Sequence, residues 1–465
     1  MKLTKIVCTI GPASDSQEVL EKMMRAGMNV TRLNTSHGSK EEHEERIATI
    51  TKAAKATSTN IGILLDLAGP KIRLGELETP TIQLVNGKSI VLTTEKVIGT
   101  DKRITVNYAK LPEELKKGSI VMLDDGKKKL QVTNISGTEI TCKIIVGGII
   151  KPRRGVNIPN GYLSIKSLTT ADKDMLKHFY NKGVDMVALS FVRTASDIMD
   201  LKKILKSLDW SPGIIAKIET QEALDHIDEI LNLVDGIMIA RGDLAIETPR
   251  EYVPVRQKEL IIKAIAKGKH TIVATQMVES MIHERYPTRA EVSDIATAIF
   301  DGADAIMTSE ETSLGKYPVE TIETMTDVAE HVEGVYTPQV TITYDEQSPV
   351  SHAIARHAQQ LADSLNTHCI VALTESGRTA RDIAQFRGNK VIYALTPSDD
   401  SMRKLSVVRG VYPVHFVPTK PIEDIRPDIV NLVKTIEKQK NQTMVIVSGS
   451  TMRKLGSTNM IIVEH

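Results

Sequence analysis

The chain has 465 residues and a formal net charge of +1, with both signs mixed throughout, which disfavours a nucleic-acid partner. Aromatic residues make up 3% of the chain and there is one Trp, so no base-stacking platform is expected. Cys8, Cys142 and Cys369 have no CxxC spacing and favour reduced thiols in a cytoplasmic protein. No apolar run is long enough to predict a membrane span or a signal region.

An alternation of short apolar runs with amphipathic stretches dominates the first two thirds of the chain. The runs are typical of buried strands, and stretches such as Asp197–Leu208 and Arg256–Ala266 have helical spacing. This order predicts an α/β fold built on a (β/α)8 barrel, because an open doubly wound sheet suits fewer strands. The expected strands are Lys5–Ile10, Asn29–Leu33, Gly62–Leu67, Met186–Phe191, Gly213–Ile218, Gly236–Ala240, Thr271–Thr275 and Ala305–Met307.

The alternation stops between Leu74 and Ser167. Short runs there alternate apolar and polar residues, and turn pairs such as Asn86-Gly87 and Asp125-Gly126 separate them. The pattern predicts a small β-barrel domain inserted after the third strand. Since the insertion emerges at the rim that carries barrel active sites, we interpret it as a lid, with an inert decoration as the alternative.

The last third of the chain is predicted to be a second α/β domain. Cys369–Leu373, Val391–Ala394 and Met444–Val447 have strand character and alternate with helical stretches. The turn Thr374–Thr379 brings small hydroxyl residues and a glycine to a helix start, which is typical of an anion site and equally of an ordinary N-cap. The predicted domains are thus barrel 1–73, lid 74–167, barrel 168–336 and C-terminal domain 337–465.

Polar residues follow the apolar runs strand after strand. They gather at the carboxyl ends of the predicted strands, the rim on which (β/α)8 barrels carry their active sites. They are Arg32, Asn34, Asp66, Arg193, Glu219, Asp243, Thr275, Gln276 and Ser309.

Two neighbouring strand ends carry a lysine and two carboxylates. Side chains two apart on a strand share a face, so Lys217 and Glu219 point the same way. If the next strand is a parallel neighbour, Glu219 and Asp243 project side by side and favour a hard divalent cation such as Mg²⁺. A lysine beside such a metal is typical of stabilising a forming anion, either an enolate or a phosphoryl group. A surface cluster of salt bridges is the alternative.

Seven segments match one known family in order and at the spacing of barrel strands. They are Lys5–Pro12 (KIVCTIGP), Thr31–Gly38 (TRLNTSHG), Asp66–Arg73 (DLAGPKIR), Ala216–Glu219 (AKIE), Ala240–Leu244 (ARGDL), Ala274–Met277 (ATQM) and Pro287–Asp294 (PTRAEVSD). On these motifs the chain resembles pyruvate kinase over nearly its whole length. The resemblance implies a barrel with an inserted lid and a C-terminal effector domain, and phosphoryl transfer from phosphoenolpyruvate to ADP, giving pyruvate and ATP.

The resemblance also implies roles for single residues around the substrate. Glu219 and Asp243 would hold Mg²⁺, for which Mn²⁺ could substitute. Lys217 would stabilise the phosphoryl group in flight and the enolate oxygen, and Arg32 would position the phosphate through its planar fork.

Further roles concern the substrate carboxylate, the proton and the nucleotide. Backbone N–H groups of Gly242 and Asp243 would receive the carboxylate. The Thr275 hydroxyl would take part in the proton relay through water, shared with Ser309. The nucleotide-binding residues implied by the resemblance are Asn34, His37, Arg73 and Arg154.

One departure from the commonest family pattern concerns a monovalent cation. Many members carry Thr and Glu where this chain has Leu67 and Lys71, and a K⁺ ion sits near the equivalents of Asn34, Ser36 and Asp66. In members with a lysine, the ammonium supplies that charge. We therefore expect activity without K⁺, unless Lys71 points to solvent.

The resemblance extends to partners. It implies a homotetramer and a phosphorylated allosteric effector, with AMP or a sugar monophosphate as candidates, held by Thr374, Ser376, Gly377, Arg378 and Thr379. Two alternatives stay open: a Mg²⁺-dependent aldolase or lyase barrel acting on pyruvate enolates, and a non-catalytic sensor of phosphorylated metabolites. The lid and Arg73 disfavour the first, and the presence of Lys217, Glu219 and Asp243 disfavours the second.

Overall fold

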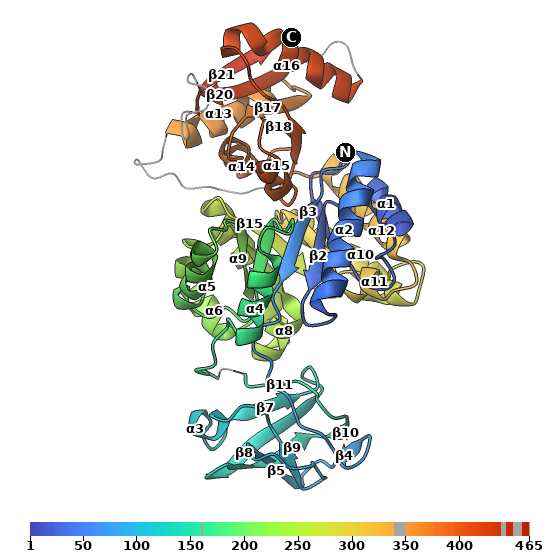
Figure 1. Ribbon diagram of the computed structural model, residues 1–465, viewed down its shortest axis with the longest axis vertical. Helices are drawn as coiled ribbons and strands as arrows, with labels where there is room; N and C mark the ends of the chain where they lie inside the picture. Colours follow the sequence, from blue (N-terminus) through green and yellow to red (C-terminus); the bar gives the residue numbers. More distant parts are fainter. Residues whose placement is uncertain (160, 339–349, 439–442, 450–457, 465) are drawn as a thin grey trace.

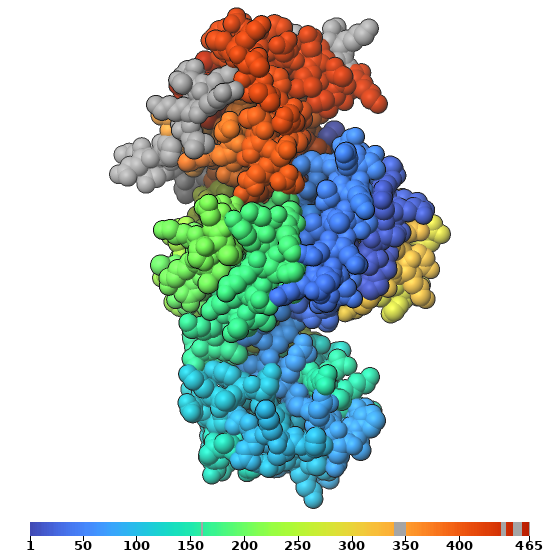
Figure 2. All heavy atoms as spheres, in the orientation of Figure 1, coloured from blue at the N-terminus to red at the C-terminus, as the bar shows by residue number. Residues whose placement is uncertain are grey.

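The computed structural model describes residues 1–159, 161–338, 350–438, 443–449 and 458–464. Figure 1 shows three parts stacked along the long axis: the C-terminal domain, the barrel in the middle and the β domain at the opposite end. In the space-filling view, the molecule is narrower where the β domain joins the barrel (Figure 2).

The middle part is a closed barrel of parallel strands in the order β1-β16-β15-β14-β13-β12-β3-β2. Its strands are β1 (Lys5–Thr9), β2 (Val30–Asn34), β3 (Gly62–Asp66), β12 (Met186–Leu189), β13 (Gly213–Ile218), β14 (Gly236–Ala240), β15 (His270–Ala274) and β16 (Ala305–Thr308). Neighbours along the chain are neighbours in the barrel, so all carboxyl ends meet at one rim.

Helices follow the barrel strands and cover their outer face (Figure 1). They are α1 (Gln17–Ala26), α2 (Lys40–Thr57), α4 (Thr170–Phe179), α5 (Ala195–Ser207), α6 (Gln221–Asp225), α7 (Ile227–Leu231), α8 (Arg241–Glu247), α9 (Val253–Ala266), α10 (Arg289–Phe300), α11 (Glu310–Ser313) and α12 (Pro318–Val335), with 3-10 turns η1 (Arg250–Tyr252) and η2 (Glu279–Ile282). Local sequence sets their starts: Ser39 and Thr288 each form a capping box with a glutamate three residues on.

The β domain lies between β3 and α4. It has a six-stranded sheet, β11-β7-β8-β9-β5-β6, and a two-stranded sheet, β10-β4, around a separate apolar core. Its elements are β4 (Ile82–Leu84), β5 (Ser89–Thr93), β6 (Arg103–Thr105), α3 (Leu111–Glu114), β7 (Ile120–Leu123), β8 (Lys128–Ser136), β9 (Glu139–Val146), β10 (Gly148–Ile150) and β11 (Val156–Asn157).

The C-terminal domain is a five-stranded sheet in the order β19-β18-β17-β20-β21, parallel except for β21. Its elements are α13 (Val350–Ser364), β17 (Cys369–Leu373), α14 (Arg378–Ala384), β18 (Val391–Thr396), α15 (Asp399–Leu405), β19 (Val411–His415), α16 (Ile422–Glu437), β20 (Met444–Gly449) and β21 (Thr458–Glu464).

The predicted fold class is confirmed, and all eight expected barrel strands lie within a few residues of their predicted bounds. One strand that the sequence analysis did not predict is β19, which contains Pro413. A proline argues against a central strand, but β19 is an edge strand, where a ladder donor can be missing. The domain limits at residues 74, 168 and 337 remain a prediction. No described helix combines the length and apolarity needed to cross a membrane.

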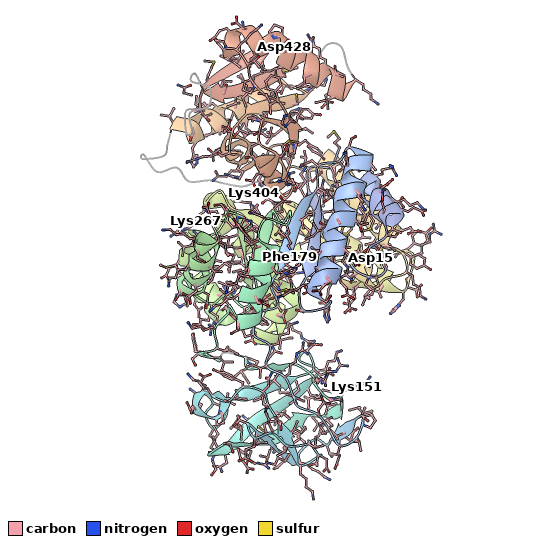
Figure 3. All side chains as sticks on the ribbon, viewed as in Figure 1. Asp15, Lys151, Phe179, Lys267, Lys404 and Asp428 are labelled. Atoms are coloured by element: carbon pink, nitrogen blue, oxygen red, sulfur yellow. The ribbon has the colours of Figure 1, made fainter. Side chains whose placement is uncertain are left out.

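A buried ion pair joins the C-terminal domain to the amino-terminal end of the barrel. Asp304, just before β16, accepts hydrogen bonds from Arg387 Nη2 at 2.6 Å and from the backbone N–H groups of Arg409 and Thr271 at 3.1 and 3.0 Å. Near this boundary Lys404 also donates to the Ser211 carbonyl at 2.6 Å (Figure 3). Asp304 and Arg387 are both almost fully buried, so removing either one would leave the other as a buried charge without its counter-ion.

We predict that Asp304→Asn lowers the free energy of unfolding by about 3 kcal/mol, because Arg387 keeps its charge and loses its counter-ion. Urea denaturation followed by circular dichroism measures this. Asp400→Asn is the matched control: its pair with Lys404 is exposed and should be worth less than about 1 kcal/mol. Equal shifts of both variants would contradict the prediction.

Candidate active site

Lys217 is held inside a ring of polar atoms at the carboxyl ends of β3, β12 and β13. Its Nζ lies 3.0 Å from Glu219 Oε1 and 3.4 Å from Asp66 Oδ1, and it donates to Ser190 Oγ at 2.7 Å. Burial lowers the pKa of Lys217, but the carboxylates of Asp66 and Glu219 outweigh burial and the net pKa is raised. The shared face expected for Lys217 and Glu219 is therefore present, with the ammonium charged.

Arg32 lies beside this ring on β2. Its Nε donates to Asp66 Oδ2 at 2.7 Å, and its Nη1 donates to Thr9 Oγ1 at 2.8 Å. Burial raises the pKa of Asp66, yet Lys217 and Arg32 overcome that effect and keep it below its usual value. Asp66 thus joins the two cations and fixes where both point.

Glu219 and Asp243 form the predicted carboxylate pair. β13 and β14 are parallel neighbours, with Ile218 opposite Ile239, and Asp243 lies in the first turn of α8, directly after β14. Burial and then the charge of Glu219 raise the pKa of Asp243 to about 6. A divalent cation would relieve this repulsion, so the donor set fits such an ion as two of its ligands. Among the described residues, no three His, Cys, Asp or Glu side chains cluster as a metal site.

Glu219 is also anchored by backbone. Its Oε2 accepts a hydrogen bond from the N–H of Phe191 at 2.6 Å. Phe191 follows β12 and has a left-handed backbone with φ of 53°, an uncommon conformation for this residue type. The turn after β12 therefore positions one of the two carboxylates.

Thr275 meets Gly242 at the neighbouring rim position. The N–H of Gly242 donates to Thr275 Oγ1 at 2.9 Å, and that hydroxyl donates to the Ala274 carbonyl at 2.6 Å. The structure thus places both residues together, and the Gly242 N–H expected to receive a substrate carboxylate bonds here to Thr275. Ser309 lies at the end of β16, where its N–H donates to Glu311 Oε2 at 2.6 Å.

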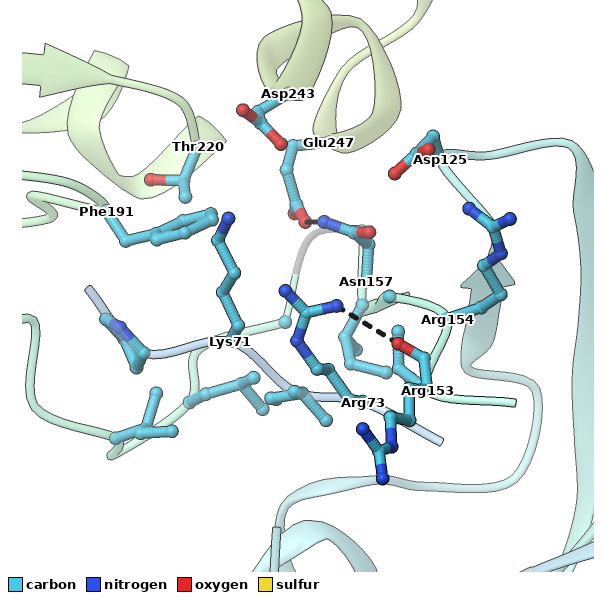
Figure 4. Close-up of a pocket in the computed structure, with 18 of the residues that line it drawn as sticks. Lys71, Arg73, Asp125, Arg153, Arg154, Asn157, Phe191, Thr220, Asp243 and Glu247 are labelled. Atoms are coloured by element: carbon cyan, nitrogen blue, oxygen red, sulfur yellow. Dashed lines mark hydrogen bonds between the residues drawn. The ribbon is translucent and has the colours of Figure 1, made fainter. Parts of the chain in front are cut away.

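A cavity of about 740 Å³ lies between the β domain and the barrel rim. Figure 4 shows its cationic wall: Arg73 donates from Nη1 to the Arg153 carbonyl at 3.0 Å, and the Arg154 side chain lies near Asp125. Arg154 Nε also lies 3.3 Å from Asp124 Oδ1. Asn34 and His37 are on the β2 side and do not line this cavity.

Lys71 lines the same cavity, and Figure 4 shows its side chain extended toward Phe191 and the helix that carries Asp243. Burial lowers its pKa first, followed by the charges of Arg73 and Lys217, while Asp243 and Asp66 act in the opposite direction. The Leu67 side chain packs in the apolar core and presents no oxygen. The positive charge of Lys71 therefore interacts with the carboxylates of Asp66 and Asp243.

Sequence reasoning missed four residues of this region. Ser190 binds Lys217, Arg241 binds the backbone around Thr275, and Asn157 of the β domain donates to Glu247 at 3.4 Å. Burial raises the pKa of Glu247 to about 7. Ser190 and Arg241 stand at strand ends, the position that marked the other rim residues, whereas the contact between Asn157 and Glu247 joins two domains and has no local signal.

The predicted effector residues lie at the start of α14. Gly377 has φ of 77° and precedes the helix, and Thr379 Oγ1 is 2.8 Å from Thr458 Oγ1. Arg378 is exposed, with Nε 3.7 Å from Asp382 Oδ2. Thr374 and Ser376 lie in the turn before them.

Comparison with known proteins matches both major parts of the chain. The family model of the pyruvate kinase barrel domain matches residues 1–322, and that of the pyruvate kinase alpha/beta domain matches residues 352–464. Pyruvate kinase of Thermotoga maritima is 42% identical over 462 residues, covering 99% of both chains. That of Staphylococcus haemolyticus is 42% identical over 468 residues, covering 99% of this chain and 80% of the relative.

A solved structure of the same family has a similar fold. The crystal structure of a pyruvate kinase from Cryptosporidium parvum superposes with a TM-score of 0.92 at 32% identity, covering 100% of this chain and 96% of that one. The chain therefore belongs to the pyruvate kinase family.

Proposed function

We propose that this enzyme transfers the phosphoryl group of phosphoenolpyruvate to ADP, with divalent-cation dependence, in the last step of glycolysis. The observation that carries the proposal is the buried set of Lys217, Glu219 and Asp66 next to Asp243, at one end of an arginine-lined cavity. The test is pyruvate formation from phosphoenolpyruvate and ADP with Mg²⁺. Absence of turnover with both substrates present would reject it.

Lys217 and Arg32 supply the fixed positive charge. Both are buried and paired, so they need no reorganisation when negative charge moves on the substrate. Lys217 Nζ lies 3.0 Å from Glu219 and 3.4 Å from Asp66, so it would stabilise an enolate oxygen that forms beside these carboxylates. Arg32 would offer a planar fork to phosphate oxygens. A divalent cation held by Glu219 and Asp243 would neutralise charge on the substrate oxygens.

Thr275 supports the protonation of the enolate. Its hydroxyl accepts the Gly242 N–H, so a substrate carboxylate that binds this N–H would replace that hydrogen bond and lie beside Thr275. A threonine hydroxyl is a weak acid, and we therefore propose that it orders a water chain shared with Ser309.

The cavity wall favours a nucleotide over the smaller substrates of an aldolase. Arg73 and Arg154 come from both sides of the junction between barrel and β domain, and guanidinium groups match phosphate oxygens. We propose these two as contacts of the nucleotide phosphates, with Asn34 and His37 farther along the rim, and the β domain as a lid over the site.

We further propose independence from K⁺, a phosphorylated effector at Thr374–Thr379 and a homotetramer in the cytoplasm. Lys71 supports the first, because it already places a positive charge near Asp66 and Asp243. Exposed apolar side chains on the barrel helices and the turns beside them support the tetramer, since burial in an interface would cover them. They include Tyr252, Val255, Ile262 and Leu314. The three buried free cysteines suit a reducing compartment.

Lys217→Met is predicted to lower kcat by about a hundred- to a thousandfold, because it removes the cation that faces the forming anion. Steady-state kinetics measures this, with thermal melting as the check on folding. Lys203→Met, at an exposed position on α5, is the control. A Lys217→Met enzyme with nearly normal kcat would remove this role.

Glu219→Gln and Asp243→Asn are each predicted to raise the Mg²⁺ midpoint of activity by at least about tenfold, because each replaces one charged ligand. Activity is titrated against Mg²⁺ at saturating substrates. Glu229→Gln, at an exposed position on α7, should leave the midpoint unchanged. If both site variants keep the wild-type midpoint, the metal is held elsewhere.

Activity is predicted to be independent of K⁺, because the Lys71 ammonium supplies the charge without an ion-binding equilibrium. The assay uses tetramethylammonium buffer free of Na⁺ and K⁺, followed by KCl at constant ionic strength. Lys71→Glu combined with Leu67→Thr should then create K⁺ dependence. Strong activation of the wild type by K⁺, or indifference of an active double variant, would contradict the substitution argument.

Arg378→Ala is predicted to weaken activation by phosphorylated effectors while leaving the unactivated rate within about twofold, since a phosphate at this turn would bind the guanidinium. Activation curves with AMP, ribose 5-phosphate, glucose 6-phosphate and fructose 1,6-bisphosphate measure this. Arg426→Ala, which removes a partly exposed pair in the same domain, is the control. Identical curves for wild type and Arg378→Ala would exclude the residue from the effector site.

A further inference from the structure

Thr275 and Gln276 adopt left-handed backbone conformations, with φ of 72° and 56°. This region is uncommon for residues other than glycine and is an outlier for a β-branched residue such as threonine. Such a conformation is strained and persists only where its surroundings enforce it. The turn after β15 therefore has to be held in place by other groups.

The group that holds this turn is the guanidinium of Arg241. Its Nη2 donates to the Thr275 carbonyl at 2.6 Å, and its Nε donates to the Ala274 carbonyl at 3.3 Å. On its other side, Nη1 donates to Asp294 Oδ1 at 2.7 Å, and Nη2 is 2.7 Å from Asp294 Oδ2. The Arg241 side chain is 11% exposed and does not line the cavity.

These contacts of Arg241 also determine where the Thr275 hydroxyl lies. With the carbonyls of Ala274 and Thr275 held, Thr275 Oγ1 lies 2.9 Å from the Gly242 nitrogen. Arg241 is the residue directly before Gly242 at the start of α8, so one side chain ties the end of β15 to the end of β14. The relative position of Thr275 and Gly242 then depends on Arg241.

We propose that Arg241 is a positioning residue for the reaction, which acts by holding Thr275 in its left-handed conformation with the hydroxyl beside the Gly242 N–H. This role rests on the proposed function, in which the Thr275 hydroxyl takes part in protonating the enolate. Lysine cannot replace the arginine here: its single nitrogen keeps the charge toward Asp294 but cannot span two carbonyls and a carboxylate.

The test compares Arg241→Lys, Thr275→Ala and the double variant, with Arg256→Lys as the control. Arg256 lies on α9 and pairs with the exposed Glu259. Arg241→Lys should lower kcat/KM for phosphoenolpyruvate by about 10- to 100-fold, because a misplaced group far from the chemistry has this effect. The double variant should match Thr275→Ala within about twofold, because both changes act through one hydroxyl. Multiplied losses, or an Arg241→Lys enzyme that equals wild type, would overturn the proposal.

A second readout does not depend on activity. In a crystal structure of Arg241→Lys, Thr275 should leave the left-handed region, or its hydroxyl should leave the Gly242 N–H. Thr275 unchanged in that structure would overturn the proposal even if the wild type proves to have another activity, so its failure differs from failure of the proposed function. Should Arg241→Lys not fold, Asp294→Asn weakens the same anchor and should give a smaller loss of kcat/KM in the same direction, and an unchanged kcat/KM would count against the role.

Discussion

The ion cluster around Lys217 is the interaction on which the whole rim depends. Asp66 lies between Arg32 and Lys217, and Glu219 completes the set, with every member nearly buried. Buried charges are tolerated only where partners and hydrogen bonds satisfy them, so these contacts restrain each side chain. Asp243 lies next to this cluster of paired charges, and burial and the charge of Glu219 raise its pKa. Asp243 is thus the carboxylate beside the cluster where the proposed divalent cation would add positive charge.

The barrel explains how residues so far apart in sequence come together in this cluster of charges. Parallel strands with sequential order bring every carboxyl end to one rim, and the turns after β12 and β15 then re-aim single groups through left-handed residues, Phe191 and Thr275. Strain at both turns is offset by hydrogen bonds to rim side chains, Glu219 in one and Arg241 in the other. The β domain adds Arg153 and Arg154 to the cavity, and Arg73 and Asp243 reach it from the barrel side, so both parts of the chain line it.

Sequence patterns predicted the parts of this arrangement that follow from local periodicity. The alternation of strands and helices indicated the barrel, and two-residue spacing on a strand placed Lys217 beside Glu219. The same reasoning could not find the pairing of Asp66 with Lys217, because it joins strands that lie far apart in the chain and depends on the barrel closing. Nor could it find the Arg241 contacts, since they are to backbone carbonyls in a conformation that no residue preference favours. Gly242 was predicted from its motif, but its bond to Thr275 depends on that turn.

Glu219 and Asp243 are proposed to share one divalent cation beside Lys217. The most direct measurement is anomalous diffraction from crystals grown with Mn²⁺ and phosphoenolpyruvate, with Mn²⁺ standing in for Mg²⁺. We expect one strong anomalous peak within about 2.0–2.3 Å of a carboxylate oxygen from each residue, with the Lys217 ammonium facing the bound substrate. A peak at another site, or one ligated by only one of the two carboxylates, would contradict this account of the rim.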